Sequence, residues 1–222
     1  MGSRMMHYCI AALIESRLGW HDRQFMLGNL APDVVEYAVN DRSKRRSHFI
    51  RLDSTGEGFF DLERFAATYL REQRSLFHIG YYFHLLTDDL WIKKIYAPYI
   101  SKLPPEDRQE AKEKYERDLC RLDSQLPAYY GIVYTPLNDE VLAMPEADLK
   151  LLPLLVSDLE HKWIDTDDTS APLESLELLQ WDKVTAVLEE TVQACLTQLR
   201  MWEEADQMFF RHGYRQTLEG NL

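Results

Sequence analysis

Apolar residues recur every three or four positions over most of this chain, and this spacing is what most restricts its fold. The first segment with this pattern consists of Met6, Ile10, Leu13, Ile14 and Leu18. Later segments with it cover residues 61–96, 104–126, 146–163 and 181–210. A period near 3.6 places such residues on one side of an α-helix. We therefore expect an all-α fold, with the first helix ending near Gly19.

The expected helices form one domain that spans residues 1–222. The chain has 222 residues, of which 45% are hydrophobic, so it is long enough to bury a substantial core. No strand hairpin and no internal repeat is apparent in the sequence. The polar segment 41–57 contains Gly56, and we expect it to be a loop that carries His48.

Charge and composition restrict the classes of partner and compartment. The chain carries 37 acidic and 25 basic residues, a net charge of −12, which argues against general nucleic-acid binding. No apolar run reaches the roughly 18 residues of a membrane span, and no secretory signal is visible. Three cysteines lie far apart without a CxxC pair. We expect a cytoplasmic protein, and the sequence leaves its oligomeric state open.

The strongest chemical signal is a histidine and an acid four residues apart within an apolar helix. His84 and Asp88 fall on one face of that helix, one turn apart. A charged Asp88 in apolar surroundings requires a partner, and a metal ion is one. Imidazole and carboxylate are both ordinary zinc ligands. A simple hydrogen-bonded pair in the core is the alternative interpretation.

Three further residues are weak signals when taken singly. Asp33 stands in an apolar run, where a first-turn carboxylate would also be favoured by the helix dipole. His7 lies on the apolar face of the first helix, where a core histidine is the ordinary interpretation. His48 stands in a basic, polar segment, where a surface histidine is the ordinary interpretation.

In combination and in this order, these residues resemble the zinc-dependent phospholipase C family, whose superfamily includes the fungal single-strand nucleases. The matching pieces are His7, the run Leu27–Asp33 (LGNLAPD), Ser47-His48 and the run Gly80–Asp88 (GYYFHLLTD). The resemblance covers roughly the first 90 residues. It implies an all-α fold of the phospholipase C and nuclease type.

The resemblance also implies a set of metal ligands. One ion would be bound by Asp33, His48, His84 and Asp88, with Asp33 and Asp88 as the catalytic carboxylates. A neighbouring ion would share Asp88 and use His7, together with the amino-terminal residue of the mature chain. Larger family members begin with a tryptophan, and this chain does not.

The resemblance also breaks down at the site of a third ion. Larger family members place another histidine soon after the HxxxD acid, where this chain has Ile92, Lys93 and Lys94. A later HxxxD, His161 and Asp165, is a weaker candidate for a further ion and equally suits a surface helix end. We expect one or two ions rather than three.

The implied activity is metal-dependent hydrolysis of a phosphoester, either a small molecule or a lipid. A zinc ion lowers the pKa of bound water and polarises a phosphoryl oxygen. Manganese or iron would suit the same ligands. Tyr81, one turn before His84, is a candidate for lining the cleft. Candidate phosphate contacts are Lys44, Arg45, Arg46, Lys93 and Lys94.

Two other functions fit parts of the sequence. His21-Asp22 supplies the dipeptide of the HD-type metal phosphohydrolases, although Asp22 also suits a helix cap. Alternatively, the metal is structural and holds helices together in a non-catalytic protein whose acidic surface serves a protein partner. Removal of a structural ion should unfold the chain, whereas removal of a catalytic ion should leave most of its helix content.

Overall fold

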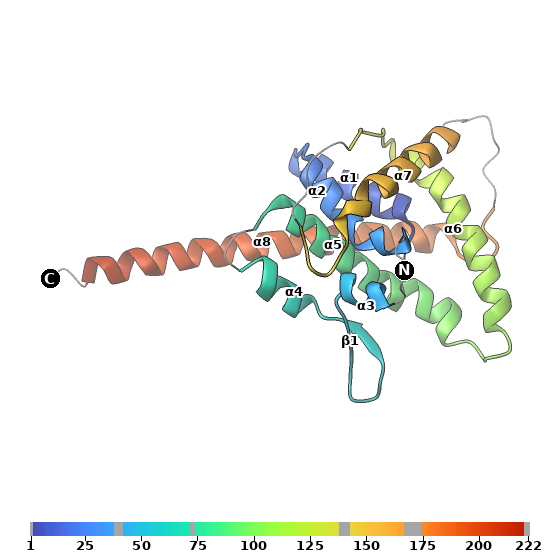
Figure 1. The fold of residues 1–222 in the computed structure, drawn as a ribbon, viewed down its shortest axis with the longest axis horizontal. Coiled ribbons are helices and arrows are strands. Elements are labelled where there is room, and N and C mark those ends of the chain that lie inside the picture. The colour runs from blue at the N-terminus through green and yellow to red at the C-terminus, as the bar shows by residue number, and fades with distance from the viewer. Residues whose placement is uncertain (1, 38–41, 72–73, 138–142, 167–174, 220–222) are drawn as a thin grey trace.

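The computed structural model describes residues 2–37, 42–71, 74–137, 143–166 and 175–219, and these form a mainly helical body (Figure 1). The α-helices are α1 (Arg4–Leu18), α2 (Arg23–Leu30), α3 (Arg42–Ser47), α4 (Leu62–Tyr69), α5 (Leu76–Trp91), α6 (Arg108–Tyr130), α7 (Leu152–Thr166) and α8 (Trp181–Glu219). Shorter or differently wound helices are η1 (Ala31–Tyr37), η2 (Ile92–Ser101) and η3 (Leu149–Leu151). The predicted all-α class is thus confirmed at the level of helix content.

The two N-terminal helices begin and end at residues whose chemistry explains their bounds. The Ser3 side chain accepts a hydrogen bond from the Met6 amide and so caps α1. Gly19, with φ of 67°, ends α1 as predicted. Asp22 accepts a hydrogen bond from the Phe25 amide and so caps α2. These caps fix where α1 stops and where α2 turns back across the body.

Helices α2 and α5 cross with their backbones in direct contact, because each has a glycine at the crossing. A Cβ atom on Gly28 would lie 1.9 Å from the Phe77 carbonyl oxygen. A Cβ atom on Gly80 would lie 2.2 Å from the Phe25 carbonyl oxygen. No side chain fits at such distances, so this close approach requires glycine on both helices. Gly80 thus lies at a close contact between two helices.

The segment expected to be a loop contains regular structure. Strands β1 (Ile50–Leu52) and β2 (Gly58–Phe60) form an antiparallel hairpin that projects from the body (Figure 1). The Asp53 carboxylate accepts hydrogen bonds from the Thr55 and Glu57 amides and so closes the turn. The expectation that no hairpin exists was wrong, because three residues per strand are too few to produce a visible alternation.

The remaining differences concern helix boundaries. The expected helix over 61–96 is two helices, since Ser75 caps α5 separately. The π-helix η2 continues directly from α5. Helix α6 passes through Pro127 and ends at Gly131, whose φ is 62°.

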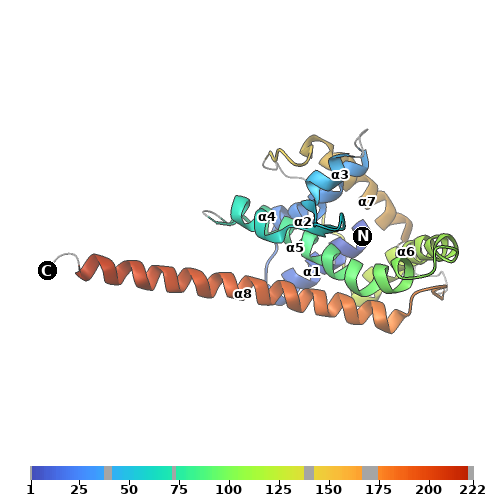
Figure 2. The same cartoon turned by 90° about the horizontal axis from the view of Figure 1, so that it is seen from below.

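Helix α8 lies along one side of the body and extends beyond it (Figure 2). Its Val184, Val187, Leu188 and Val192 are buried in the same core as residues of α1 and α5. Among the described residues, no helix has both the length and the apolar character needed to cross a membrane.

Candidate metal centre

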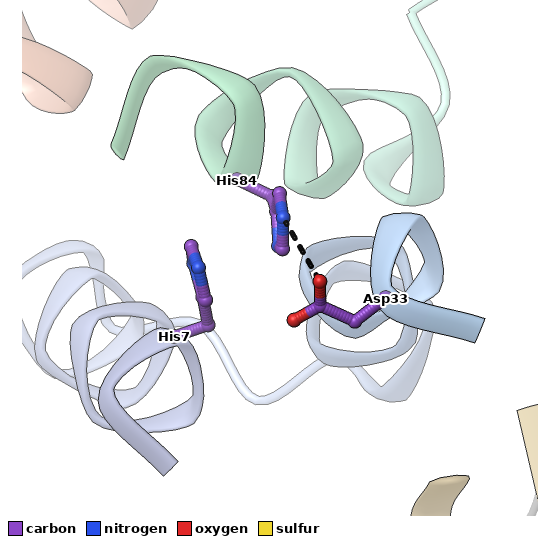
Figure 3. A group of neighbouring side chains, drawn as sticks. All are labelled: His7, Asp33 and His84. Carbon is purple, nitrogen blue, oxygen red and sulfur yellow. Dashed lines mark ion pairs between the residues drawn. The ribbon is translucent and has the colours of Figure 1, made fainter. Parts of the chain in front are cut away.

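The five predicted ligands come from four separate parts of the chain and meet in the interior. His7 lies on α1, Asp33 on η1, His48 directly after α3, and His84 and Asp88 on α5. The four other than Asp33 are 0% exposed, and Asp33 is 3% exposed. Figure 3 shows the rings of His7 and His84 side by side, with the Asp33 carboxylate facing His84. The predicted convergence is therefore present.

The Nε2 atoms of His48 and His84 lie within 4 Å of one oxygen each of Asp33 and Asp88. The His48 Nε2 atom lies 3.4 Å from His84 Nε2, 3.4 Å from Asp33 Oδ1 and 3.6 Å from Asp88 Oδ2. The His84 Nε2 atom lies 3.6 Å from Asp88 Oδ2 and 3.9 Å from Asp33 Oδ1. Two imidazoles and two carboxylates thus surround a small volume.

These separations fit shared ligation better than direct hydrogen bonding. N–H···O hydrogen bonds usually measure about 2.7–3.2 Å. In a tetrahedral zinc site with ligand bonds of about 2.0–2.1 Å, neighbouring donor atoms lie about 3.3–3.4 Å apart. The shortest measured separation, 3.4 Å, equals this ligand-to-ligand distance, and the longest is 3.9 Å. The buried histidines and aspartates can therefore hold a metal ion, as the groupings His48–His84–Asp88 and His7–Asp33–His84 also indicate.

Hydrogen bonds on the far side of each ring direct the Nε2 atoms inward. The His84 Nδ1 atom lies 2.8 Å from the Asn29 carbonyl oxygen, so Nδ1 donates and Nε2 retains its lone pair. The His48 Nδ1 atom lies 2.9 Å from Ser47 Oγ. Since Ser47 Oγ donates to the Lys44 carbonyl, it accepts from His48. Both rings, when neutral, then present lone pairs to the same point.

A second grouping lies against the first. The His7 ring stacks on His84 with centroids 3.7 Å apart. Its Nε2 atom is 3.3 Å from Asp88 Oδ1, and neither of its ring nitrogens has a hydrogen-bond partner. The same Asp88 Oδ1 accepts the Gly2 amide at 3.0 Å. Asp88 thus presents Oδ1 to His7 and Oδ2 to His48 and His84, and its Oδ2 lacks a hydrogen bond.

The electrostatics of the cluster favour ionised carboxylates. Burial raises the pKa of both carboxyl groups, but nearby imidazoles outweigh it: His84, His48 and His7 at Asp33, and His7 and His84 at Asp88. The net result is a lowered pKa at Asp33 and a strongly lowered one at Asp88. Burial lowers the pKa of His7, while the carboxylates raise that of His84 against its own burial. Ionised carboxylates and a neutral His7 are the states a cation requires.

Several other candidate residues lie away from the cluster. Asp22 caps α2 and, with His21, lines a hollow of about 640 Å³ beside α1. Tyr130 and the segment after it border that same hollow. His161 is exposed, with Nδ1 bonded to the Ser157 carbonyl, and the Asp165 side chain lies outside the described residues.

The predicted phosphate contacts and cleft lining are placed as follows. Lys93 pairs with Asp89 and Lys94 with Glu190 on the surface. Arg45 is exposed, and Arg46 donates to the Pro145 carbonyl oxygen. Lys44 alone of this group borders a cleft next to the centre.

Sequence reasoning missed the residues that support the ligands. Tyr81 was expected to line the cleft, but it is buried and donates its hydroxyl hydrogen bond to the Ser47 carbonyl at 2.6 Å. In the sequence, Ser47 stands out only by its place in the dipeptide Ser47-His48, and Asn29 only by its place in the run Leu27–Asp33. For Ser47 the available signal was a hydroxyl residue directly before the candidate ligand His48, whereas Asn29 acts through its backbone carbonyl and gave none.

Comparisons of the chain with family models, curated proteins and solved structures find no match. The functional interpretation therefore depends on the geometry of the cluster and on the residues themselves.

Proposed function

We propose that this protein is a metal-dependent phosphoester hydrolase of the zinc-dependent phospholipase C type. The observation that carries the proposal is the convergence of His48 Nε2, His84 Nε2, Asp33 Oδ1 and Asp88 Oδ2, with separations of 3.4–3.9 Å. Two carboxylates and two inward-facing imidazoles are costly to bury unless a cation balances the negative charge.

In this proposal, Asp33, His48, His84 and Asp88 hold a zinc ion. When bound, such an ion supplies Lewis-acid activation of water and of a phosphoryl oxygen. Asp33 and Asp88 provide the negative charge that balances the cation, and Asp33 is the only one of the four with measurable exposure. Asn29 and Ser47 keep both rings in the tautomer that leaves Nε2 free.

The same proposal gives His7 a role at a second ion. His7 has no hydrogen-bond partner on either ring nitrogen, although it is fully buried. A buried imidazole without partners is costly, and a cation shared with Asp88 Oδ1 would satisfy it. We therefore expect one or two ions per chain. Manganese or iron would also suit these ligands.

Metal analysis of the purified protein tests the proposal. We expect one or two zinc equivalents in the wild type, and zinc-dependent hydrolysis of bis-p-nitrophenyl phosphate. Both should be lost in His84→Ala and in Asp33→Ala. His21→Ala is the matched control, because it removes an imidazole outside the cluster, and it should keep both. Unchanged metal content in His84→Ala and Asp33→Ala would remove the hypothesis.

Removal of the metal separates a catalytic ion from a structural one. After chelation we expect the far-ultraviolet circular dichroism to keep most of its helical signal, because the helices share a large apolar core. Complete unfolding on chelation, without phosphoester hydrolysis by the loaded protein, would favour the non-catalytic alternative.

A further inference from the structure

A cleft of about 630 Å³ lies directly outside the metal centre. Gly2 connects the two, since it borders the cleft and its amide donates to Asp88 Oδ1. The metal ligands themselves are almost completely buried, so a substrate must approach from an adjoining space. The volume lies within the range of about 300–1,000 Å³ of small-molecule sites.

Four cationic side chains border this cleft, together with the acidic residues Glu36, Glu116 and Asp123. Arg4 is held by Glu36, and Lys162 lies 3.4 Å from Asp123. For Lys44 and Lys112, no acidic partner lies within ion-pair distance in the part of the chain that the structure describes. Two lysines beside the centre are thus available to a negatively charged ligand.

The cleft is also bordered by a hydrogen-bond acceptor, the Asp123 carboxylate. Asp123 on α6 borders it and is 8% exposed. Lys162 contacts its Oδ2 atom and the Ser3 side chain also stabilises the carboxylate, while its Oδ1 atom is buried and has no hydrogen bond of ordinary geometry. A buried carboxylate oxygen without a donor is costly, so it suits a ligand that brings a hydroxyl or an amine.

The positions of the exposed apolar side chains indicate whether the ligand is a free molecule or part of a membrane. The large apolar side chains that are exposed on the described surface are Leu52, Phe59, Tyr129, Val133, Leu154, Ile164 and Met201. None of them borders the cleft. An enzyme that works on a bilayer needs apolar contacts with it near its site. This cleft is lined by charged side chains together with Tyr96, Tyr115 and Leu119, which are buried or half-buried and offer no exposed apolar surface to a bilayer.

We propose that the substrate is a small, water-soluble phosphoester whose phosphate binds Lys44 and Lys112 and whose hydroxyl or amine donates to Asp123 Oδ1. This inference deepens the proposed hydrolase function and rests on it. The same phosphate chemistry allows a free ester or a lipid headgroup, and this inference selects the free ester.

Binding of inorganic phosphate tests the lysines without relying on turnover. The double variant Lys44→Ala/Lys112→Ala should weaken phosphate binding at least about tenfold in titration calorimetry, since hydrogen bonds to charged groups contribute strongly. The control is Lys102→Ala/Lys183→Ala, which removes two exposed lysines outside the cleft and should bind like the wild type. Equal affinity in the two double variants would overturn the inference, with or without bound zinc.

Hydrolysis by the zinc-loaded protein tests the substrate form. We expect glycerol 2-phosphate to be hydrolysed faster than phosphatidylcholine vesicles, and the reverse order would overturn the inference. Asp123→Asn should raise KM for glycerol 2-phosphate about tenfold relative to KM for p-nitrophenyl phosphate, which has no hydroxyl or amine to donate. An equal change in both KM values would assign Asp123 to folding alone.

The two proposals fail in distinguishable ways. Absence of metal binding would remove the hydrolase function, while phosphate titration of the metal-free protein would still test the lysines. Zinc-dependent hydrolysis that is indifferent to the lysines would keep the hydrolase function and remove this inference.

Discussion

Two aspartates in this protein are equally buried and have opposite surroundings. Asp118 on α6 is 0% exposed, and both of its carboxylate oxygens accept hydrogen bonds. Its donors are Arg121 and the backbone amides of Glu177, Leu178 and Leu179. It therefore ties the segment before α8 to α6, with its acceptor capacity used by the protein itself.

Asp88 on α5 is also 0% exposed, but much of its acceptor capacity is unused. Its Oδ2 atom has no hydrogen bond and lies 3.6 Å from the Nε2 atoms of His48 and His84. Burial of an acid is thus a poor guide to function. The better guide is whether its oxygens are satisfied, because an unsatisfied buried carboxylate requires a ligand.

Replacing each aspartate with asparagine sharpens this contrast, and the largest effect should be on metal affinity. Asp88→Asn removes a negative ligand, so we expect zinc affinity to fall more than about 1,000-fold. Competition against a chromophoric chelator measures it. Asp118→Asn is the matched control and should keep wild-type affinity in its folded fraction. A loss of affinity of similar size in both variants would erase the distinction.

For stability we expect the opposite order, with the larger loss in Asp118→Asn. Asp118→Asn places an NH₂ group against backbone amides and leaves donors unpaired, so we expect a loss of about 2–4 kcal/mol in the free energy of unfolding. Asp88→Asn in the metal-free protein should cost about 1 kcal/mol or less, since its oxygen can still accept the Gly2 amide. Urea unfolding curves of the two variants compare them directly.

A smaller effect is expected one step away from the ligands. Ser47→Ala removes the acceptor that orients His48, so zinc affinity should fall about 10–100-fold. Ser124→Ala is matched, because Ser124 Oγ also donates to the carbonyl three residues earlier but contacts no histidine. An unchanged affinity in Ser47→Ala would show that packing alone holds the ring.

The smallest effect is the pH dependence of zinc binding. Burial lowers the pKa of His84, but the Asp33 and Asp88 carboxylates outweigh it, so the pKa of His84 is raised above 6.5. Protons then compete with zinc already above pH 6.5, and affinity should decline as pH falls through that raised pKa, by at most about tenfold per unit for one proton. Chelator competition from pH 8 to 6 measures the decline. A constant affinity down to pH 6.5 would contradict it.

The parts of the centre that were predictable are those encoded locally. His84 and Asp88 lie one helical turn apart, and a period of 3.6 places them on one face without knowledge of the tertiary structure. Asp33 follows a proline at the start of a short helix, which is also a local pattern. The end of α1 at Gly19 and the start of α8 at Trp181 follow from apolar spacing in the same way, whereas α8 continues to Glu219, past the expected end at residue 210.

What could not be predicted depends on how distant segments meet. The Asn29 carbonyl that orients His84 is a backbone group, which no residue type announces. The contact of Gly2 with Asp88 spans 86 residues and depends on how α1 approaches α5. His48 stood in an expected loop because the short hairpin after it shows no periodic signal. Tyr81 looked like a cleft residue because its hydroxyl partner is also a distant carbonyl.

The glycine crossing of α2 and α5 also determines how such a centre can be lost. A methyl group at position 80 would drive Phe25 and its helix away, and Asn29 on that helix would withdraw from His84. A displacement of about 1 Å in a catalytic group can cost about 100-fold in rate. A chain with alanine there would keep every candidate ligand and still lose the contact that orients His84. A sequence comparison restricted to the candidate ligand residues would not detect this loss.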